Sequence, residues 1–138
     1  MYGSGPVPGL DLEPLLEENL FIVGCDAASL KTLLNPRREC EARHLEGLPL
    51  VLPAREHGLR TVIEDAVGRA GVPLHVIAEL DASEQLKEMV RRTGCHTISS
   101  VAAIRHDPHE SEFAIAPIVN PKMVRVVERA HQRAAAGA

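Results

Sequence analysis

Residues 48–70 constrain the fold of this chain more than any other segment. The segment opens with the apolar run LPLVL, which is too short for a helix and is typical of a buried strand. A polar turn over residues 53–58 follows. Apolar residues then recur at helical spacing on one face and stop at Gly71, which predicts an amphipathic helix over residues 59–70. This order of strand, turn and helix places backbone N–H groups and the positive end of a helix dipole beside a sheet edge.

The turn carries three charged or titratable side chains, Arg55, Glu56 and His57, followed by Gly58. A plain surface connection explains them in one interpretation, because charged residues are common in loops. In the other interpretation the turn is a binding site, since ligands of open α/β sheets bind at the carboxyl ends of strands, near helix N-termini. Gly58 permits close approach of a ligand, and Arg55 and His57 add charge or donors, so the turn suits an anion.

Composition excludes several classes of function. The chain has 138 residues, 45% of them hydrophobic and 25% charged, which is ordinary for a folded globular protein with one modest domain or two small lobes. The net charge is −4 and aromatic residues make up only 2%, so neither a basic face nor a stacking platform for bases is expected. No apolar run approaches the roughly 18–20 residues of a membrane span, and no signal peptide is recognisable. We expect a cytoplasmic protein that contacts neither DNA nor membrane directly.

Motifs for catalysis or metal binding are missing from the sequence. It contains no GxSxG, HExxH or GxxxxGK[ST] pattern, and its three cysteines are widely spaced without a CxxC pair. His106 and His109 have a spacing that some metal sites use, but they lie in a polar segment that predicts a surface loop. Cys95 and His96 are adjacent, which sends their side chains to opposite faces of a strand and argues against a nucleophile–base pair. The sequence predicts no catalytic residue, no metal site and no cofactor.

The middle of the chain alternates strands and helices, which is typical of an α/β fold with a parallel or mixed sheet. Asp81 and Glu84 have the spacing of a capping box before a helix that ends at Gly94. Asn120 and Pro121 predict the N-cap and first turn of a final helix. The remaining predicted elements are strands at residues 20–23, 74–80, 95–99 and 113–119, a short helical turn at 26–34, and a turn or brief helix at 101–104.

Four segments, in order, resemble the effector-binding domain of LysR-type transcriptional regulators. LPLVLPAREHGLR, at residues 48–60, is similar to the PLxLPSRxHGLR segment of that family. Residues 2–24 (YGSGPVPGLDLEPLLEENLFIVG) and 74–97 (LHVIAELDASEQLKEMVRRTGCHT) resemble two further family segments. The closing pattern, Pro-Ile at residues 117–118 and PKMVR at 121–125, resembles a fourth. Together these segments span nearly the whole chain.

The resemblance implies an α/β fold of the periplasmic-binding-protein-like type II class, in which two lobes hold a small effector between them. By this comparison, residues 25–108 form one nearly complete lobe, lobe two. Residues 1–24 and 109–138 are then remnants of an incomplete lobe one. The winged helix-turn-helix of a complete regulator has no counterpart in the sequence, so we expect an N-terminally truncated regulator.

The resemblance also implies which residues contact the effector, a small metabolite that is anionic if the turn over residues 53–58 is its site. His96 stands where the family often has an aromatic residue, and Cys95 replaces a glycine there. The residues implied in ligand binding are Arg55, Glu56, His57, Gly58, His96, Thr97, Gly3 and Ser4.

Two alternatives remain beside a non-catalytic effector-binding domain. In the first, the chain is a regulator remnant that acts only as a dimerisation or interaction module. Its contacts would come from the helix over residues 83–93 and the strand over residues 74–80, which resemble the element that pairs across the family's dimer. The second alternative is a free-standing solute-binding protein, which shares the fold but would require a signal peptide.

Overall fold

The computed structural model describes residues 10–55 and 58–132, which fall into two compact units. One unit is Asn19–Met123, and the other contains residues 10–18 and 124–132 of the described chain. In chain order the elements are β1 (Leu10–Gly24), α1 (Ala27–Leu30), the 3₁₀ helix η1 (Lys31–Leu33), β2 (Cys40–Glu41), the 3₁₀ helix η2 (Ala42–Leu45), β3 (Pro49–Leu52), α2 (Gly58–Ala70), β4 (His75–Glu79), α3 (Ser83–Thr93), β5 (Thr97–Ser100), α4 (Val101–Arg105), the 3₁₀ helix η3 (Glu110–Glu112), β6 (Ala114–Val119) and β7 (Val124–Gln132).

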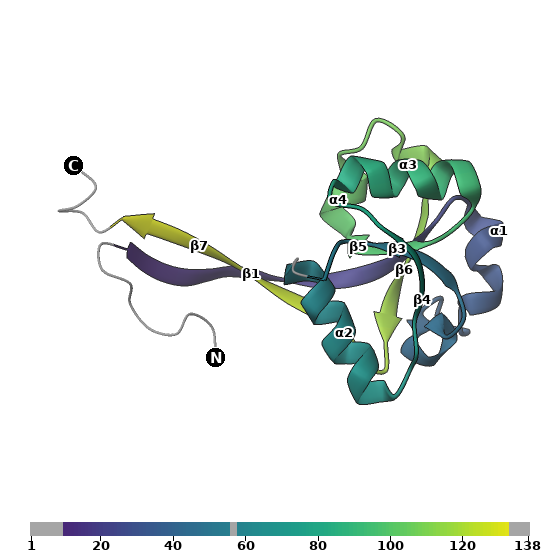
Figure 1. Cartoon of the computed structure of the whole chain (residues 1–138), viewed down its shortest axis with the longest axis horizontal. Helices are drawn as coiled ribbons and strands as arrows, with labels where there is room; N and C mark the ends of the chain where they lie inside the picture. Colours follow the sequence, from purple (N-terminus) through teal and green to yellow (C-terminus); the bar gives the residue numbers. More distant parts are fainter. Residues whose placement is uncertain (1–9, 56–57, 133–138) are drawn as a thin grey trace. The chain divides into compact units, whose positions relative to one another are not determined.

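The larger unit is built on a mixed sheet with helices on both faces (Figure 1). The second half of β1 pairs antiparallel with β5 on one side and with β6 on the other, and β6 pairs parallel with β2. β3 and β4 form a parallel pair. A parallel bridge between Leu50 and His96 joins this pair to the start of β5, with Val51 N–H donating to His96 O at 2.9 Å.

β3 divides the core into two layers, because its consecutive side chains point to opposite faces. Leu50 and Leu52 pack in one cluster with Ile63 of α2. Val51 packs in the other cluster with Val90 of α3. All five side chains are fully buried. The predicted buried strand and the amphipathic helix that follows it are therefore confirmed, and the predicted α/β fold class with them.

The predicted C-terminal helix is wrong. Asn120 and Pro121 are joined by a cis peptide bond and form a turn, after which β7 pairs with β1. In the smaller unit, Arg125 and Glu18 form an ion pair at 3.4 Å across these two strands. The valines of this segment fit a helical stripe, but β-branched residues also favour strands, and pairing with β1 decides between the two.

The predicted capping box at α3 is also wrong. The N-cap of α3 is Ala82, which makes no side-chain cap bond, and Glu84 pairs instead with Lys87 at 2.9 Å. A capping box forms at α1, where Asp26 accepts a hydrogen bond from the backbone N–H of Ser29 at 2.8 Å. The end of α3 is as predicted, because Gly94 adopts the left-handed conformation.

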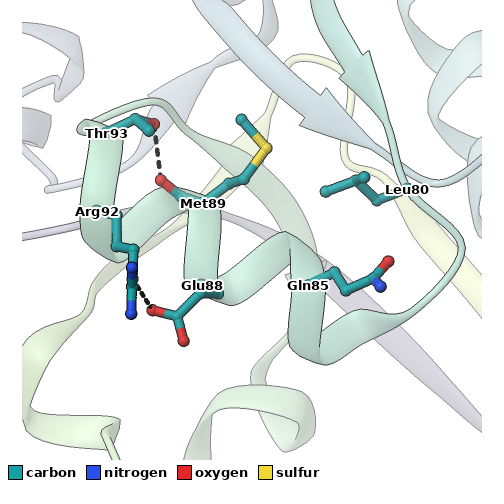
Figure 2. Close-up of a pocket in the computed structure, with 6 residues that line it drawn as sticks. All are labelled: Leu80, Gln85, Glu88, Met89, Arg92 and Thr93. Carbon is teal, nitrogen blue, oxygen red and sulfur yellow. Dashed lines mark hydrogen bonds and ion pairs between the residues drawn. The ribbon is translucent and has the colours of Figure 1, made fainter.

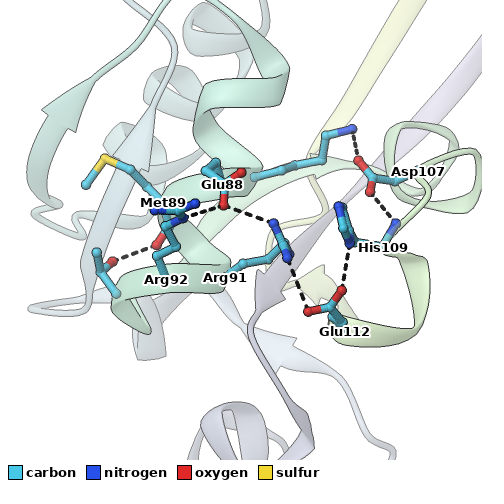
Figure 3. Close-up of polar contacts among 9 residues, drawn as sticks. Glu88, Met89, Arg91, Arg92, Asp107, His109 and Glu112 are labelled. Atoms are coloured by element: carbon cyan, nitrogen blue, oxygen red, sulfur yellow. Dashed lines mark hydrogen bonds and ion pairs between the residues drawn. The ribbon is translucent and has the colours of Figure 1, made fainter.

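The polar segment predicted as a surface loop, residues 105–112, is anchored to α3 by a polar network (Figure 3). Lys87 Nζ lies 2.6 Å from Asp107 Oδ2, and both side chains are buried. Arg91 reaches Glu112, which also pairs with His109 at 2.7 Å. The hydrogen bond from Lys87 and one from the His109 backbone lower the pKa of Asp107. Burial alone would lower the pKa of Lys87, but its bonds to Asp107 and Glu84 outweigh burial and raise it.

We expect Asp107→Ala to lower the free energy of unfolding by about 3 kcal/mol, because it leaves the buried Lys87 charge without its closest partner. Urea denaturation measures this loss. The control is Arg43→Ala, which removes an exposed ion pair with Glu41 and should leave stability unchanged. Equal stability of the two variants would contradict an anchoring role for the Lys87–Asp107 pair.

The pH dependence of the same pair follows from the two shifts. The pKa of Asp107 is lowered in the folded state. Its contribution to the free energy of unfolding is therefore present above the ordinary carboxyl pKa of about 4, and it is lost as pH falls through the lowered value. Because the pKa of Lys87 is raised, its contribution is lost only as pH rises above the ordinary lysine value. Wild type should therefore lose more stability than Asp107→Ala on acidification.

Candidate functional site

One edge of the sheet gathers the carboxyl ends of three parallel strands. β4 runs parallel to β3, and the chain entering β5 bridges β3 in the same direction. The turn to α2 follows β3, the turn to α3 follows β4, and α4 begins directly after β5. Three helices therefore begin at this edge, where the positive ends of their dipoles favour an anion.

Gly58 and Arg55 occupy this edge after β3. Gly58 is the exposed first residue of α2, and space is open where a side chain would stand. Arg55 is exposed and lines a hollow of about 350 Å³ together with Thr61, Glu64 and Asp65. The hollow combines a guanidinium with two carboxylates, so it offers an anion contact and a cation contact side by side.

Arg60 lies behind the turn, with 2% of its surface exposed. Its Nη1 donates to Pro53 O at 2.8 Å and to Glu79 Oε2 at 2.9 Å. Its Nε donates to Glu64 Oε2 at 2.9 Å. One buried guanidinium thus contacts the turn, the end of β4 and α2.

Sequence reasoning did not single out Arg60, although a signal was present. Arg60 precedes Ile63 by three residues and Val67 by seven, so all three lie on the buried face of α2. A charged residue on a buried helical face requires ionic or hydrogen-bonding partners in the fold. The position of those partners, above all Glu79 in a different strand, was not readable from spacing.

His96 and Thr97 lie at the amino end of β5, where His96 pairs with Leu50 of β3. The Nε2 atom of His96 lies 3.2 Å from Ser29 O and therefore carries the proton that it donates. Its Nδ1 is buried without a described partner. Thr97 Oγ1 donates to Val51 O at 2.6 Å. The side chains of both residues are therefore engaged within the core.

The other implied ligand residues, Gly3, Ser4, Glu56 and His57, lie outside the described residues. Among residues 10–55 and 58–132, no group of three or more His, Cys, Asp or Glu could hold a metal ion. No helix in this part of the chain is long and apolar enough to cross a membrane.

The fold is that of the periplasmic-binding-protein-like type II class, as its solved neighbours show. The regulatory domain of Synechocystis CcmR in complex with 2-PG superposes with a TM-score of 0.73 at 18% identity, over 96% of this chain and 62% of that one. The effector-binding domain of QuiR in complex with shikimate superposes with a TM-score of 0.70 at 13% identity, over 92% of this chain and 57% of that one.

The family follows from the sequence comparisons. The model of the LysR substrate binding domain matches residues 1–137. The HTH-type transcriptional regulator BbuR of Bordetella bronchiseptica is 30% identical over 107 residues, which are 78% of this chain and 32% of BbuR. The chain therefore belongs to the LysR substrate-binding domain family, and it spans about a third of the length of this regulator.

The close packing of Gly24 against Ser29 and His96 can be tested by substitution. A Cβ at Gly24 would overlap Ser29 Oγ and come within 3.3 Å of His96 Cδ2. We expect Gly24→Ala to displace Ser29, break the α1 cap and cost about 2 kcal/mol of unfolding free energy. The measurement is again urea denaturation.

Gly68→Ala is the matched control, since it adds the same methyl group at an exposed α2 position with no atom within 4 Å. Helix propensity predicts a gain of about 0.5 kcal/mol or more for this variant. A Gly24→Ala protein as stable as wild type would contradict the close packing at His96.

Proposed function

We propose that this chain binds a small anionic effector at the carboxyl edge of β3, β4 and β5, centred on the turn over residues 53–58. One observation carries the proposal. The exposed Arg55 lies shortly before the 13-residue helix α2, which begins at the exposed Gly58, where space is open for a ligand. A guanidinium and the positive dipole end of a helix are complementary to a carboxylate or phosphate. Glu56 and His57, from the same motif, are included in the proposed site.

Family membership supports a binding role. LysR substrate-binding domains are generally non-enzymatic, and two solved neighbours were determined with 2-PG and with shikimate. By analogy, this chain is proposed to be non-catalytic, to require no cofactor and to act in the cytoplasm as the sensing part of a transcriptional regulator. Repression or activation of genes would require a DNA-binding domain, and the region of BbuR matched here is a third of that regulator.

The lobe assignment stays a proposal as well. Residues 25–108 would form lobe two, and residues 1–24 and 109–138 would belong to lobe one, with Gly3 and Ser4 contributing effector contacts from that lobe. His96 and Thr97 bind Ser29 and Val51. These contacts support a role for both residues in shaping lobe two.

A second candidate function is dimerisation through β4 and α3. Ile77 of β4 is 46% exposed, the one exposed large hydrophobic side chain among residues 17–55 and 58–126. β4 pairs only with β3 among the described strands, so its outer edge is open to another strand. Leu80, which follows β4, and residues of α3 line an apolar hollow of about 340 Å³, with Leu80 on one side and Met89 on the other (Figure 2).

Isothermal titration calorimetry tests the effector site. The ligands are acetate, succinate, citrate, shikimate and inorganic phosphate. We expect Arg55→Ala to weaken the tightest of these at least about tenfold, because it removes a charge-assisted hydrogen bond. His57→Ala should weaken it as well.

The control for the calorimetry is Arg92→Ala, which removes an exposed arginine of α3 that pairs with Glu88. Its affinity should equal that of wild type. If Arg55→Ala and His57→Ala bind as tightly as wild type, the site is not at this turn.

Sedimentation velocity tests the second candidate. We expect wild type to dimerise and Ile77→Glu to sediment as a monomer, because a charge in an apolar contact is costly. Ala27→Glu, on the exposed face of α1, should behave as wild type. A wild-type monomer that binds a ligand from the calorimetric panel would refute the dimerisation module.

A further inference from the structure

Among residues 17–55 and 58–126, Arg60 is the most deeply buried charged side chain. Its contacts join α2 to the turn after β3 and to the end of β4, which lies 19 residues away in the sequence. Pro53 belongs to the turn after β3, Glu64 to α2 and Glu79 to the end of β4. The side chains of Glu64 and Glu79 are 43% and 44% exposed. The guanidinium therefore lies inside while its two carboxylate partners reach it from the surface.

The geometry of these contacts requires an arginine. Pro53 O and Glu79 Oε2 share the same nitrogen, Nη1, while Glu64 takes Nε. A planar guanidinium offers these donors in fixed directions, whereas a lysine ammonium is a single point of charge. Moving the Pro53 carbonyl therefore moves the atom that also holds Glu79.

We infer that Arg60 is a positioning residue that holds Pro53, at the start of the effector turn, and links it to β4. The inference rests on the proposed effector site, and it adds a route by which that site is regulated. Pro53 opens the turn that carries Arg55, and Glu79 lies two residues from Ile77 on the same exposed face of β4. Occupancy of the turn and association through β4 are then coupled, and the coupling is reciprocal.

Glutamine substitutions test the link that Arg60 makes between the turn and β4, and they need no ligand. A negative result for this link is therefore distinguishable from a negative result for the effector site. In Arg60→Gln the Leu80 amide, which donates to Leu52 O at 3.1 Å, should exchange with solvent at least about tenfold faster. Arg91→Gln is the matched control, since it removes an α3 arginine that also has two glutamate partners. Leu80 exchange should be unchanged in that control.

A second variant keeps the test valid if Arg60→Gln does not fold. Glu79 is half-exposed, so Glu79→Gln should fold, and it should shift the backbone amide resonance of Arg55 across the Arg60 link. Glu88→Gln is its control, with a side chain that is 45% exposed and paired with arginines of α3. In the Arg60→Gln background, Glu79→Gln should shift the Arg55 resonance no further.

The results that would overturn the inference are specific. They are unchanged Leu80 exchange in Arg60→Gln, an Arg55 resonance that Glu79→Gln does not move, or an equal shift of that resonance with and without Arg60. Any of these would show that the guanidinium fills space without linking the turn to β4.

Discussion

The burial of the last three residues of β3 is the constraint on which the rest of this unit depends. Its residues Leu50, Val51 and Leu52 are fully buried, and both of its edges are paired, one with β4 and the other with the backbone of His96. A strand enclosed in this way fixes the register of its neighbours, since a slip by one residue would exchange the side chains of the two core layers. It also fixes where the strand ends, and hence where the following turn meets the N-terminus of α2. The position of the candidate site is thus a consequence of core packing.

A buried cation, Arg60, contacts the backbone directly after the end of β3. Arg60 donates a hydrogen bond to the Pro53 carbonyl, while Arg55, two residues after Pro53, is exposed. The inner arginine has carboxylate partners within the fold, and the outer one faces solvent in a hollow shared with Glu64 and Asp65. The Arg60 guanidinium is neutralised by two carboxylates of the protein, whereas in the proposed site the Arg55 guanidinium contacts the ligand. Glu64 lies between them, as a partner of Arg60 that also lines the hollow of Arg55.

The sequence predicts the parts of this fold whose periodicity is strong and local. The strand and helix at residues 48–70 and the helix that ends at Gly94 are found as predicted, because their apolar spacing and stop signal agree with their tertiary setting. The last segment is a strand, since its valines suit either structure and only pairing with β1 decides. The anchored segment around Asp107 was missed for a similar reason, because its buried partner Lys87 is 20 residues away. Of the predicted site, the turn is readable from its motif, whereas the core contacts of His96 depend on α1.

An NMR titration tests most directly whether a small anion binds at the carboxyl edge of β3, β4 and β5. The ¹⁵N-labelled chain is titrated with the anion that binds most tightly, and backbone amide shifts are mapped onto the structure. If the anion binds there, the largest amide shifts should fall at Arg55 and Gly58 and at the first turns of α2 and α4. Shifts centred on the hollow between Leu80 and Met89, or none above those caused by an equal concentration of chloride, would contradict it.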